Sequence, residues 1–483
     1  MASASASSRK NPPDAVELTI AGTDILALRT ATLGNWSYVL SSDGEAVVID
    51  PQRDVDVYLK EAKRRSVRIR LAIETHVHSD YVSGARALAH LAAADVAAPA
   101  RGRYEFQHRG VAQGDELSIG GFTLTSVETP GHTFDHVAWL FSSGPRRETR
   151  AVFSGGSLLA GGAGRTDLFG AADTRPLTRH QFASLQCLAA LPHDATVLPT
   201  HGGGSTCSAG AVTAGRFTTI GDELDANDFL RALSVDELDA HLAPSRGPAP
   251  AYFTDVAHLN RLGIAGPRRP AAPLSLAPHD FADFIAERVA VVDARDRWSF
   301  ADGHIPGSIN IEPHDTFANY VGSVVPFGRP IAIVVDSRDK AIVADLVEAT
   351  FRIGYSVAAV LEAGIEAWQA AGLPLESYHV ADIIELIKEA EDGSAPAILD
   401  VRDPAEWRDG ALPGSTTIAL RQLVSRVADL RALSAANSGR PVAVACRGGA
   451  RAAVAASLLA QLGIPVRPVL GGGIPDALAV LAQ

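Results

Sequence analysis

One cysteine in the sequence stands where a catalytic nucleophile is expected. Cys446 follows the apolar segment PVAVA, and an alanine-rich stretch that predicts a helix to about Gln461 comes shortly after it. The loop between the two consists of Arg447, Gly448, Gly449, Ala450 and Arg451. A glycine-rich turn of this kind directs backbone N–H groups and a helix N-terminus at the sulfur, which stabilises a thiolate or the terminal sulfur of a persulfide. We therefore predict Cys446 and Arg451 as catalytic residues and the other four loop residues as substrate-binding.

A second set of residues has the types that bind metal ions. The segment LAIETHVHSD places His76, His78 and Asp80 directly after a predicted strand. His132 follows the strand of TSVETPGH, and His201 follows the strand of ATVLPTH. Because strand ends converge on one edge of a sheet, we expect these side chains to meet there, as a metal site requires.

Several domains are needed to position these residues. The 483 residues have the length of about three domains, and 47% hydrophobic with 20% charged residues is typical of globular proteins. Short β-branched runs predict strands at EAVVID, RLAIET, FTLTSVET, RAVFS and ATVLPT, alternating with helices. We expect a flexible tail at 1–14, a first domain at 15–245, and a linker at 246–273 that contains one ordered stretch, YFTDVAHLNRLG.

The composition argues against several classes of protein. A net charge of −12 does not suit a nucleic-acid or anionic-membrane surface. Three cysteines are too few for a disulfide framework and suit a reducing cytosol. The N-terminus lacks the apolar core of a signal peptide, and no run of 18 apolar residues occurs. We expect a cytoplasmic protein without a membrane partner, for which a homo-oligomer would also fit.

An internal duplication fills the rest of the chain. The aligned segments are 289–311 with 396–418, 329–341 with 440–452, and 360–368 with 469–477, at offsets of 107 to 111 residues. Two homologous domains are therefore predicted, at 274–378 and 379–483, each with the strand and helix order of a parallel sheet covered by helices. Where the second repeat has Cys446, the first has Asp336, and a carboxylate cannot carry a sulfane sulfur.

The second repeat resembles a rhodanese, which is a sulfurtransferase. The pattern Cys-x-x-x-x-Arg after an apolar strand, with DVRDPAEW some 45 residues upstream, carries this resemblance across 379–483. It implies that Cys446 takes up a sulfane sulfur as a persulfide and passes it to a thiol, sulfite or cyanide. The first repeat would then be a rhodanese-like domain without this chemistry, serving as a spacer or docking module.

The first domain resembles the metallo-β-lactamase fold. The His-x-His-x-Asp pattern at 76–80 and the later histidines match the signature of that fold over about 16–240. Within it, the chain resembles glyoxalase II and, through GAGRTDL at 162–168, more closely persulfide dioxygenase. The domain order is similar to that of bacterial persulfide dioxygenase–rhodanese fusions. The resemblance implies an αββα metallo-β-lactamase sandwich followed by two α/β/α rhodanese-like domains with parallel sheets. It also implies oxidation of a low-molecular-weight persulfide to sulfite by a single iron.

Two metal-ligand positions of that family have changed in this chain. The last residue of the histidine signature is Tyr81, and the acidic ligand expected in AVFSGGS is Gly156. The family's iron ligands map onto His76, His132 and the missing acid. Two neutral imidazoles hold Fe(II) less tightly than the arrangement of two histidines and one carboxylate.

The resemblance leaves the rest of the ligand set open. We expect His78 to complete a site of three histidines, with His76 and His132, for one iron or zinc ion. Asp80 and His201 are weaker candidates, and a remnant that binds no metal is the alternative. In the GRTD block, Arg165 either binds the thiol substrate or forms a buried ion pair with Asp167.

Three functions follow from these features. The first is a sulfur-metabolism enzyme, in which a persulfide-handling lactamase-fold domain is fused to a working sulfurtransferase that acts on a thiol persulfide, thiosulfate or sulfite. The second is a zinc thioester hydrolase of the glyoxalase II kind fused to a rhodanese. The third is a non-catalytic lactamase-fold scaffold that carries one active rhodanese domain. Iron with oxygen uptake indicates the first, zinc with thioester cleavage the second, and no bound metal the third.

Overall fold

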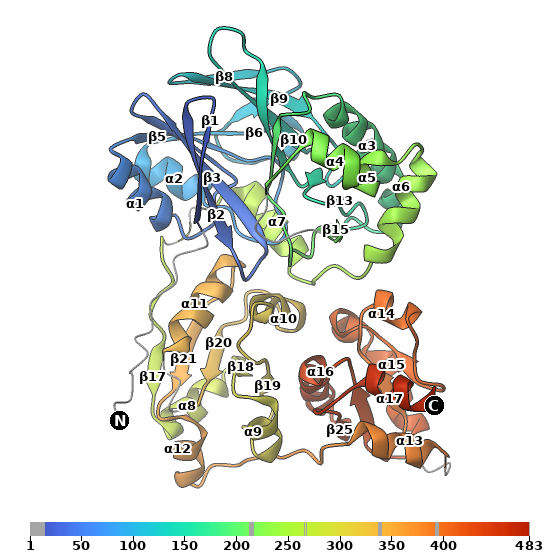
Figure 1. Cartoon of the computed structure of the whole chain (residues 1–483). Helices are drawn as coiled ribbons and strands as arrows, with labels where there is room; N and C mark the ends of the chain where they lie inside the picture. The colour runs from blue at the N-terminus through green and yellow to red at the C-terminus, as the bar shows by residue number, and fades with distance from the viewer. Residues whose placement is uncertain are drawn as a thin grey trace, which may run out of the picture. The chain divides into compact units, whose positions relative to one another are not determined.

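The structure of the chain is a computed structural model that describes residues 15–211, 217–264, 266, 268–336, 341–391 and 396–482 (Figure 1). The tail predicted at 1–14 lies outside these residues. The chain divides into two units. The first comprises Met1–His78, Ser83–Ala243 and Asn260–Gly266, and the second comprises Ser79–Val82, Pro244–Leu259 and Pro267–Gln483.

Seven strands form the first sheet of the first unit, in sequence order. They are β1 (Ala15–Ile20), β2 (Thr23–Thr30), β3 (Asn35–Ser42), β4 (Glu45–Ile49), β5 (Arg68–Ile73), β6 (Asp95–Pro99) and β7 (Arg109–Val111). Strands β1 to β4 pair antiparallel, whereas β4 to β7 pair parallel. Parallel strands put their carboxyl ends at one edge, and β5 delivers His76 and His78 there.

The second sheet has the order β16-β14-β11-β10-β9-β8. Its strands are β8 (Glu116–Ile119), β9 (Phe122–Glu128), β10 (Val137–Ser143), β11 (Thr149–Gly155), β14 (Thr196–Pro199) and β16 (Thr218–Thr219). A small third sheet joins β12 (Leu158–Leu159), β13 (Gly162–Gly164) and β15 (Ser208–Gly210). Strands β9, β11 and β14 coincide with the predicted runs FTLTSVET, RAVFS and ATVLPT. Since β11 and β14 pair parallel, both end on the same side of the sheet.

Alternating side chains hold the two sheets face to face. Val47 and Ile49 of β4 enter a buried cluster that also contains Trp139 and Phe153 of the second sheet. The intervening Val48 points the other way, into a cluster with the helices beside the first sheet. Alternate side chains of a central strand thus point to opposite faces of the sheet, and both faces are buried. One face packs against the second sheet and the other against helices, which produces a layered sandwich.

Helices cover the outer faces of this sandwich. Helices α1 (Asp56–Arg65) and α2 (Ala85–Ala92) pack on the first sheet. The second sheet is covered by α3 (Ala171–Ala189), α4 (Ile220–Ala226), α5 (Asp228–Arg231) and α6 (Val235–Leu242). Short 3-10 turns lie at Ala100–Gly102 and Ala243–Ser245. Two facing sheets with helices on both outer faces form the αββα sandwich expected from the sequence.

Two parallel sheets organise the second unit. The first has the order β17-β21-β20-β18-β19, and the second has the order β23-β22-β24-β25. Their strands are β17 (Leu274–Leu276), β18 (Ala290–Asp293), β19 (Ile309–Asn310), β20 (Ile331–Val334), β21 (Val357–Leu361), β22 (Ile398–Asp400), β23 (Thr416–Thr417), β24 (Val442–Ala445) and β25 (Val466–Pro468). All of these pairings are parallel, as the duplication predicted.

Helices flank both sheets of this unit. The first repeat has α8 (Pro278–Ile285), α9 (Arg297–Asp302), α10 (Phe317–Val324), α11 (Ile342–Arg352) and α12 (Gly364–Ala370). The second has α13 (Ile383–Glu391), α14 (Pro404–Arg408), a 3-10 helix at Leu420–Ser425, α15 (Val427–Ala436), α16 (Ala450–Gln461) and α17 (Ile474–Leu481). Helix α7 (Phe253–Leu262) is the ordered stretch expected within the linker. Each repeat thus forms a parallel sheet flanked by helices, as expected from the sequence.

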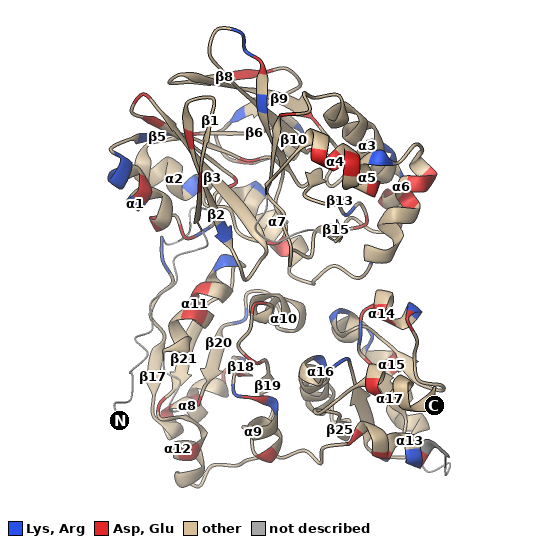
Figure 2. Cartoon of the chain, viewed as in Figure 1, with Lys and Arg blue, Asp and Glu red and all other residues tan. Residues whose placement is uncertain are grey.

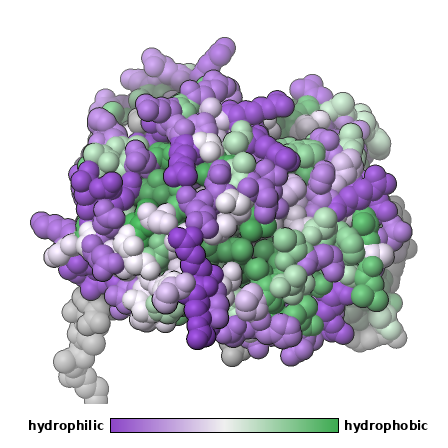
Figure 3. All heavy atoms as spheres, turned by 90° about the horizontal axis from the view of Figure 1, so that it is seen from above, coloured by the Kyte–Doolittle hydropathy of each residue, from purple (hydrophilic) through white to green (hydrophobic). Residues whose placement is uncertain are grey.

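Charged residues are spread over both units in the view of Figure 2, and several acidic residues belong to α4 and α6. In Figure 3, hydrophobic residues that reach the surface are flanked by hydrophilic ones. Among the described residues, no helix combines the length and apolar character that crossing a membrane requires.

Candidate functional site

The end of β24 places Cys446 at the start of a helix. Cys446 is 2% exposed, and the backbone N–H of Gly449 donates a hydrogen bond to its Sγ at 3.1 Å. The 12-residue helix α16 begins at the next residue, Ala450, so its N-terminal N–H groups lie near the sulfur. Gly449 has φ of +95°, and a Cβ there would lie 2.2 Å from the carbonyl oxygen of Leu470. Only glycine allows this turn.

Arg451 is held by acidic residues of the same repeat. Its guanidinium donates to Glu406 Oε1 at 2.8 Å and to Asp403 Oδ2 at 3.2 Å. Burial alone would lower the pKa of Arg451, but its hydrogen bonds to Glu406 and the charge of that carboxylate raise it. The arginine is therefore fixed, and its predicted contact with the transferred sulfur stays a prediction.

The cysteine-less repeat also touches the Cys446 loop, which sequence reasoning missed. Arg297 Nη1 donates to the carbonyl oxygen of Gly448, while Arg297 Nε donates to Glu312 Oε1 at 3.1 Å. Tyr320 also lies near this loop. Burial is the main cause that raises the pKa of the Tyr320 hydroxyl, while the charge of nearby Arg451 lowers it and Cys446 raises it. The sequence offers one signal for this contact. Arg297 has no arginine counterpart in the second repeat, where the aligned residue is Pro404.

One ion pair is common to both repeats. Arg295 Nε donates to Asp293 Oδ1 at 3.0 Å, and Arg402 Nε donates to Asp400 Oδ1 at 3.0 Å. All four side chains are buried. Since the repeat with Asp336 in place of the cysteine keeps this pair, we interpret the shared Asp-x-Arg motif as architectural rather than catalytic.

Four histidines gather at the strand ends of the first unit. His76, His78, His132 and His201 are each no more than 1% exposed. The ring centroids of His76, His132 and His201 form a triangle with sides of 5.1, 5.1 and 5.3 Å. The donor atoms of His76, His78 and His201 lie within 4.8 Å of one another, and so do those of His132, His201 and Cys207.

The hydrogen bonds of the triangle fix where its lone pairs lie. His132 Nδ1 is 2.9 Å from the carbonyl oxygen of Arg165, which can only accept, so Nδ1 carries the proton. His201 Nδ1 is 3.2 Å from Asn35 Oδ1, likewise an acceptor. Each Nε2 therefore presents a lone pair. Burial and the charge of His78 lower the pKa of His201 to about 3, so this ring stays neutral.

The same holds for His76. Its Nδ1 is 2.8 Å from Thr75 Oγ1, whose hydroxyl proton is donated to Asp50 Oδ2 at 2.8 Å, so His76 Nδ1 is the donor to Thr75. Burial and neighbouring imidazoles, His78 first among them, lower the pKa of His76. Its Nε2 lone pair lies 3.3 Å from His201 Nε2. Two facing lone pairs repel, and this spacing matches the edge of about 3.3–3.4 Å that two imidazoles span on tetrahedral zinc.

Asp50 positions both of those histidines. It accepts hydrogen bonds from the backbone N–H of Thr75 at 2.7 Å and from the hydroxyl of Thr200. Thr75 and Thr200 directly precede His76 and His201. Sequence reasoning missed this role, although a carboxylate at the end of a predicted strand was the available signal.

His78 faces carboxylates. Its Nε2 lies 3.1 Å from Asp50 Oδ1 and 3.3 Å from Glu74 Oε2. Burial alone would lower the pKa of His78, but the charges and hydrogen bonds of Asp50 and Glu74 raise it to about 10. A His78 donor atom nevertheless lies within 4.8 Å of those of His76 and His201, and the ligand role expected for His78 stays a prediction.

His136 serves the core of the site. The backbone N–H of Gly156 donates to His136 Nε2 at 2.8 Å, so Nδ1 holds the proton and donates to Thr129 Oγ1 at 2.8 Å. Both ring nitrogens are thereby used. His136 therefore holds the backbone around the site instead of offering a lone pair to it.

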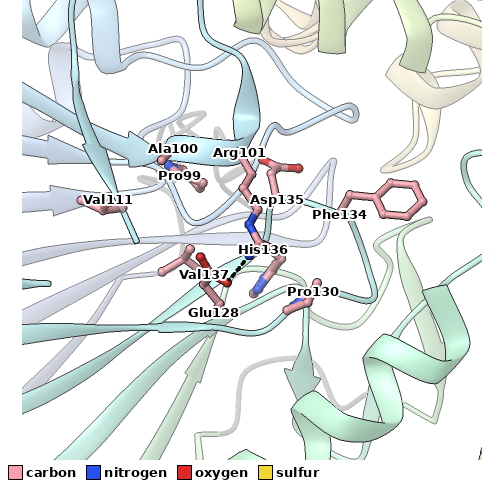
Figure 4. A pocket seen from close by; sticks show the side chains of 10 residues that line it. All are labelled: Pro99, Ala100, Arg101, Val111, Glu128, Pro130, Phe134, Asp135, His136 and Val137. Atoms are coloured by element: carbon pink, nitrogen blue, oxygen red, sulfur yellow. Dashed lines mark ion pairs between the residues drawn. The ribbon is translucent and has the colours of Figure 1, made fainter. Parts of the chain in front are cut away.

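The hollow beside His136 is too tight for a ligand. Its walls come from β6, β7, β9 and the loop after His132 (Figure 4). Figure 4 shows the ion pair of Arg101 with Glu128, at 2.9 Å, across it. No part of the hollow admits a water molecule. One residue that lines the hollow, Asp135, contributes to the histidine site. Its Oδ2 accepts a hydrogen bond from the backbone N–H of Val77 at 2.8 Å, which fixes the backbone between His76 and His78.

Arg165 and Asp80, also predicted at the site, have defined hydrogen-bond partners. Arg165 Nε and Nη2 donate to Asp167 at 2.9 and 2.7 Å, which is the ion pair foreseen as one alternative, and a substrate contact stays a prediction. Asp80 and Tyr81 are both buried, within the segment Ser79–Val82 that packs with the second unit. The carbonyl oxygen of Asp80 accepts from Tyr252 Oη at 3.1 Å.

Comparisons with known families agree with these geometries. Residues 30–214 match the model of the Metallo-beta-lactamase superfamily, and residues 277–371 and 382–477 each match the Rhodanese-like domain. The chain carries a metallo-beta-lactamase domain and two rhodanese-like domains. The predicted fusion of a metallo-beta-lactamase domain with two rhodanese-like domains is thereby confirmed, and its persulfide dioxygenase type stays a prediction.

Relatives cover parts of the chain. The "Hydroxyacylglutathione hydrolase" of Methylobacillus flagellatus is 34% identical over 169 residues, which are 35% of this chain and 62% of the relative. The enzyme of the same name from Cereibacter sphaeroides is 28% identical over 257 residues, which are 52% of this chain and 92% of the relative. The first relatives are thus matched over less than two thirds of their length. A metallo-beta-lactamase from Staphylococcus aureus shares the fold at a TM-score of 0.63, with 23% identity over 71% of this chain and 99% of that one.

Proposed function

We propose that this chain is a sulfur-metabolism enzyme whose second rhodanese-like domain transfers sulfane sulfur through a persulfide of Cys446. The observation that carries the proposal is the hydrogen bond from the Gly449 N–H to Cys446 Sγ at the start of α16. A buried sulfur with a donor aimed at it and a helix N-terminus beside it suits an anion rather than an inert core thiol.

The transfer balances without an external oxidant. The Cys446 thiolate attacks the outer sulfur of thiosulfate, the S–S bond of thiosulfate breaks, and sulfite leaves with the bonding electron pair. An acceptor thiolate, sulfite or cyanide then attacks the outer sulfur of the persulfide, and the Cys446 thiolate is released. The Gly449 N–H and α16 stabilise the sulfur anion at both stages. Arg297 donates a hydrogen bond to the carbonyl oxygen of Gly448 in the same loop.

Sulfur transfer from thiosulfate to cyanide tests this assignment. Cys446→Ser should abolish transfer, because a serine hydroxyl cannot form the sulfane intermediate. Cys187→Ser is the matched control, since Cys187 is exposed on α3, and Asp336→Ala should also leave the rate unchanged. Transfer that persists in Cys446→Ser would overturn the proposal.

For the lactamase domain we propose one metal ion held by His76, His132 and His201. The three Nε2 lone pairs and the 3.3 Å approach of two of them are the support. When bound, such an ion would supply a Lewis acid for a sulfur anion or a carbonyl. Asp50 orients His76 and His201 through the threonines that precede them, and Arg165 orients His132.

Persulfide oxidation is the leading activity for this site. In that reaction a persulfide, oxygen and water give a thiol and sulfite, with oxygen as the oxidant. Oxygen uptake by the full chain on glutathione persulfide, together with the metal content, tests it. Uptake that is lost in His132→Ala would support the activity, and a metal-loaded chain without uptake would contradict it.

Thioester hydrolysis is the second candidate, because the relatives at 28–34% identity are named hydroxyacylglutathione hydrolases. Cleavage of S-lactoylglutathione by the zinc-loaded chain, without oxygen uptake, would favour it over persulfide oxidation.

A further inference from the structure

We propose that the thiolate of Cys207 is the anionic ligand of the metal site in the lactamase domain, standing in for the carboxylate lost at Gly156. The inference rests on the metal site proposed above and adds one donor to it. The ligand set becomes His76, His132, His201 and Cys207, with His201 common to the contact with His76 and to the cluster with Cys207.

Cys207 lies at the site. Its Sγ and the donor atoms of His132 and His201 all lie within 4.8 Å of one another. Cys207 is 1% exposed, so a thiolate there would be enclosed by protein and by these two rings. Cys207 precedes β15 and follows His201 by six residues, on the loop that leaves the end of β14.

Two short bridges fix Cys207 relative to the histidines. The backbone N–H of Arg165 donates to the carbonyl oxygen of Cys207 at 2.9 Å, and the carbonyl oxygen of Arg165 accepts from His132 Nδ1 at 2.9 Å. On the other side, Ser205 Oγ is 3.3 Å from His201 Nδ1 and accepts the N–H of Cys207 at 3.3 Å. Arg165 thus links Cys207 to His132, and Ser205 links Cys207 to His201.

The Arg165 side chain strengthens the first bridge. Its Nη1 donates to the carbonyl oxygen of Thr206 at 3.2 Å, while Asp167 neutralises the guanidinium. The GRTD block therefore holds the Cys207 loop and His132 in one network. Ligand residues that are oriented by such outer contacts are typical of metal sites.

A carboxylate at position 156 has no room in this structure. A Cβ on Gly156 would lie 2.3 Å from His132 Cδ2 and 2.9 Å from His201 Cδ2. The two imidazole rings occupy the space that an acidic side chain would need. The site therefore obtains its negative charge from another direction, and among the described residues Cys207 is the thiol that shares the cluster with both rings.

Thiolate ligation changes the metal that the site selects. Binding removes the thiol proton to solvent, and the sulfur lone pair forms the bond to the metal. A soft sulfur donor beside imidazoles favours Fe(II) or Zn(II), for which Co(II) is a spectroscopic substitute, over ions that prefer oxygen ligands. The class of ligand proposed for this site is thus a thiophilic divalent cation.

Cobalt loading of the full chain tests the proposal. After the protein is stripped with a chelator and loaded with Co(II) alone, the wild type should show a sulfur-to-cobalt charge-transfer band in the near ultraviolet. Cys207→Ala should lose that band and bind Co(II) at least about tenfold more weakly, because loss of an oriented ligand costs no less than loss of an outer partner. Cys187→Ala and Cys446→Ser are matched controls that should keep the band.

The outcomes separate the two proposals. Stoichiometric Co(II) with no charge-transfer band in the wild type would overturn the role of Cys207 and leave the histidine site standing. The same Co(II) affinity in Cys207→Ala would do so too. A wild type that binds no Co(II) would overturn both the histidine site and this inference. The wild-type spectrum decides the matter even where Cys207→Ala fails to fold.

Discussion

His76 Nε2 and His201 Nε2 lie 3.3 Å apart, each with its proton on the opposite nitrogen of its ring. These residues are 125 positions apart in the chain and follow two strands, β5 and β14, that belong to different sheets. Two neutral imidazoles held lone pair to lone pair store repulsion that a shared cation relieves. The sandwich therefore brings the rings together in the arrangement that a metal ion stabilises.

The first prediction follows from that pair. His76→Ala and His201→Ala should each weaken metal binding by at least about tenfold, because each removes a ligand that its own hydrogen bonds have oriented. Metal analysis after equilibrium dialysis measures this. His136→Ala is the control, since both of its ring nitrogens are already used, and it should lower the melting temperature while keeping the metal. Equal metal in all four proteins would contradict the site.

His78 should matter for stability more than for metal. His78→Ala leaves the buried carboxylates Asp50 and Glu74 without their cation, and breaking a buried pair in this way costs about 3–5 kcal/mol. Chemical unfolding would measure the loss in the free energy of unfolding. His78→Ala protein that folds with wild-type stability but has lost its metal would show instead that His78 is a ligand.

Gly156→Asp should fail to restore an iron site. The new Cβ would overlap the ring of His132, and overpacking of this kind costs about 1–3 kcal/mol. We expect a lower melting temperature and no gain in Fe(II) affinity. Gly156→Ala should show the same destabilisation, because the clash arises at the Cβ. Tighter Fe(II) binding by Gly156→Asp at native stability would refute this reading of the site.

Arg297 should position the Cys446 loop from the neighbouring repeat. Arg297→Ala removes a charged donor to the Gly448 carbonyl, an interaction of about 1.5–3 kcal/mol. We expect kcat for transfer from thiosulfate to fall roughly tenfold, while the melting temperature of the chain changes little. Arg329→Ala, which alters an exposed arginine of the same repeat, should leave kcat unchanged. Partial rescue by Arg297→Lys would separate the hydrogen bond from the shape of the side chain.

The pair of Glu406 with Arg451 should make stability depend on pH in acid. Burial alone would raise the pKa of Glu406, but Arg451 lowers it below its ordinary value of 4.5. A carboxyl whose pKa is lowered on folding stabilises the protein above its unfolded pKa, and this contribution disappears as the pH falls through the lower folded value. Unfolding by urea between pH 6 and pH 3 should show that decline in the wild type. Glu406→Gln should be less stable at pH 6 and decline less steeply.

The sequence alone determined much of this protein. Runs such as EAVVID and FTLTSVET alternate with the period of strands, and their turn residues mark where each strand ends. The repeats at 274–378 and 379–483 made the parallel sheets predictable, and a cysteine in a glycine-rich strand-to-helix turn indicated sulfur chemistry at Cys446. These features are local, because strand period, turn chemistry and helix N-termini depend on a few adjacent residues.

The tertiary structure decided which of the candidate residues meet. Spacing along the chain placed His78 beside His76, and the fold adds His201 to them, with the donor atoms of all three within 4.8 Å of one another. Only the folded chain shows that His78 Nε2 also faces Asp50 and Glu74. The position of Cys207 near His132 depends on loops more than 70 residues apart that the backbone of Arg165 joins. Side-chain direction at a strand end depends on which sheets pack together and which buried charges must be paired. That balance is set by contacts distant in sequence, so only the folded chain could determine it.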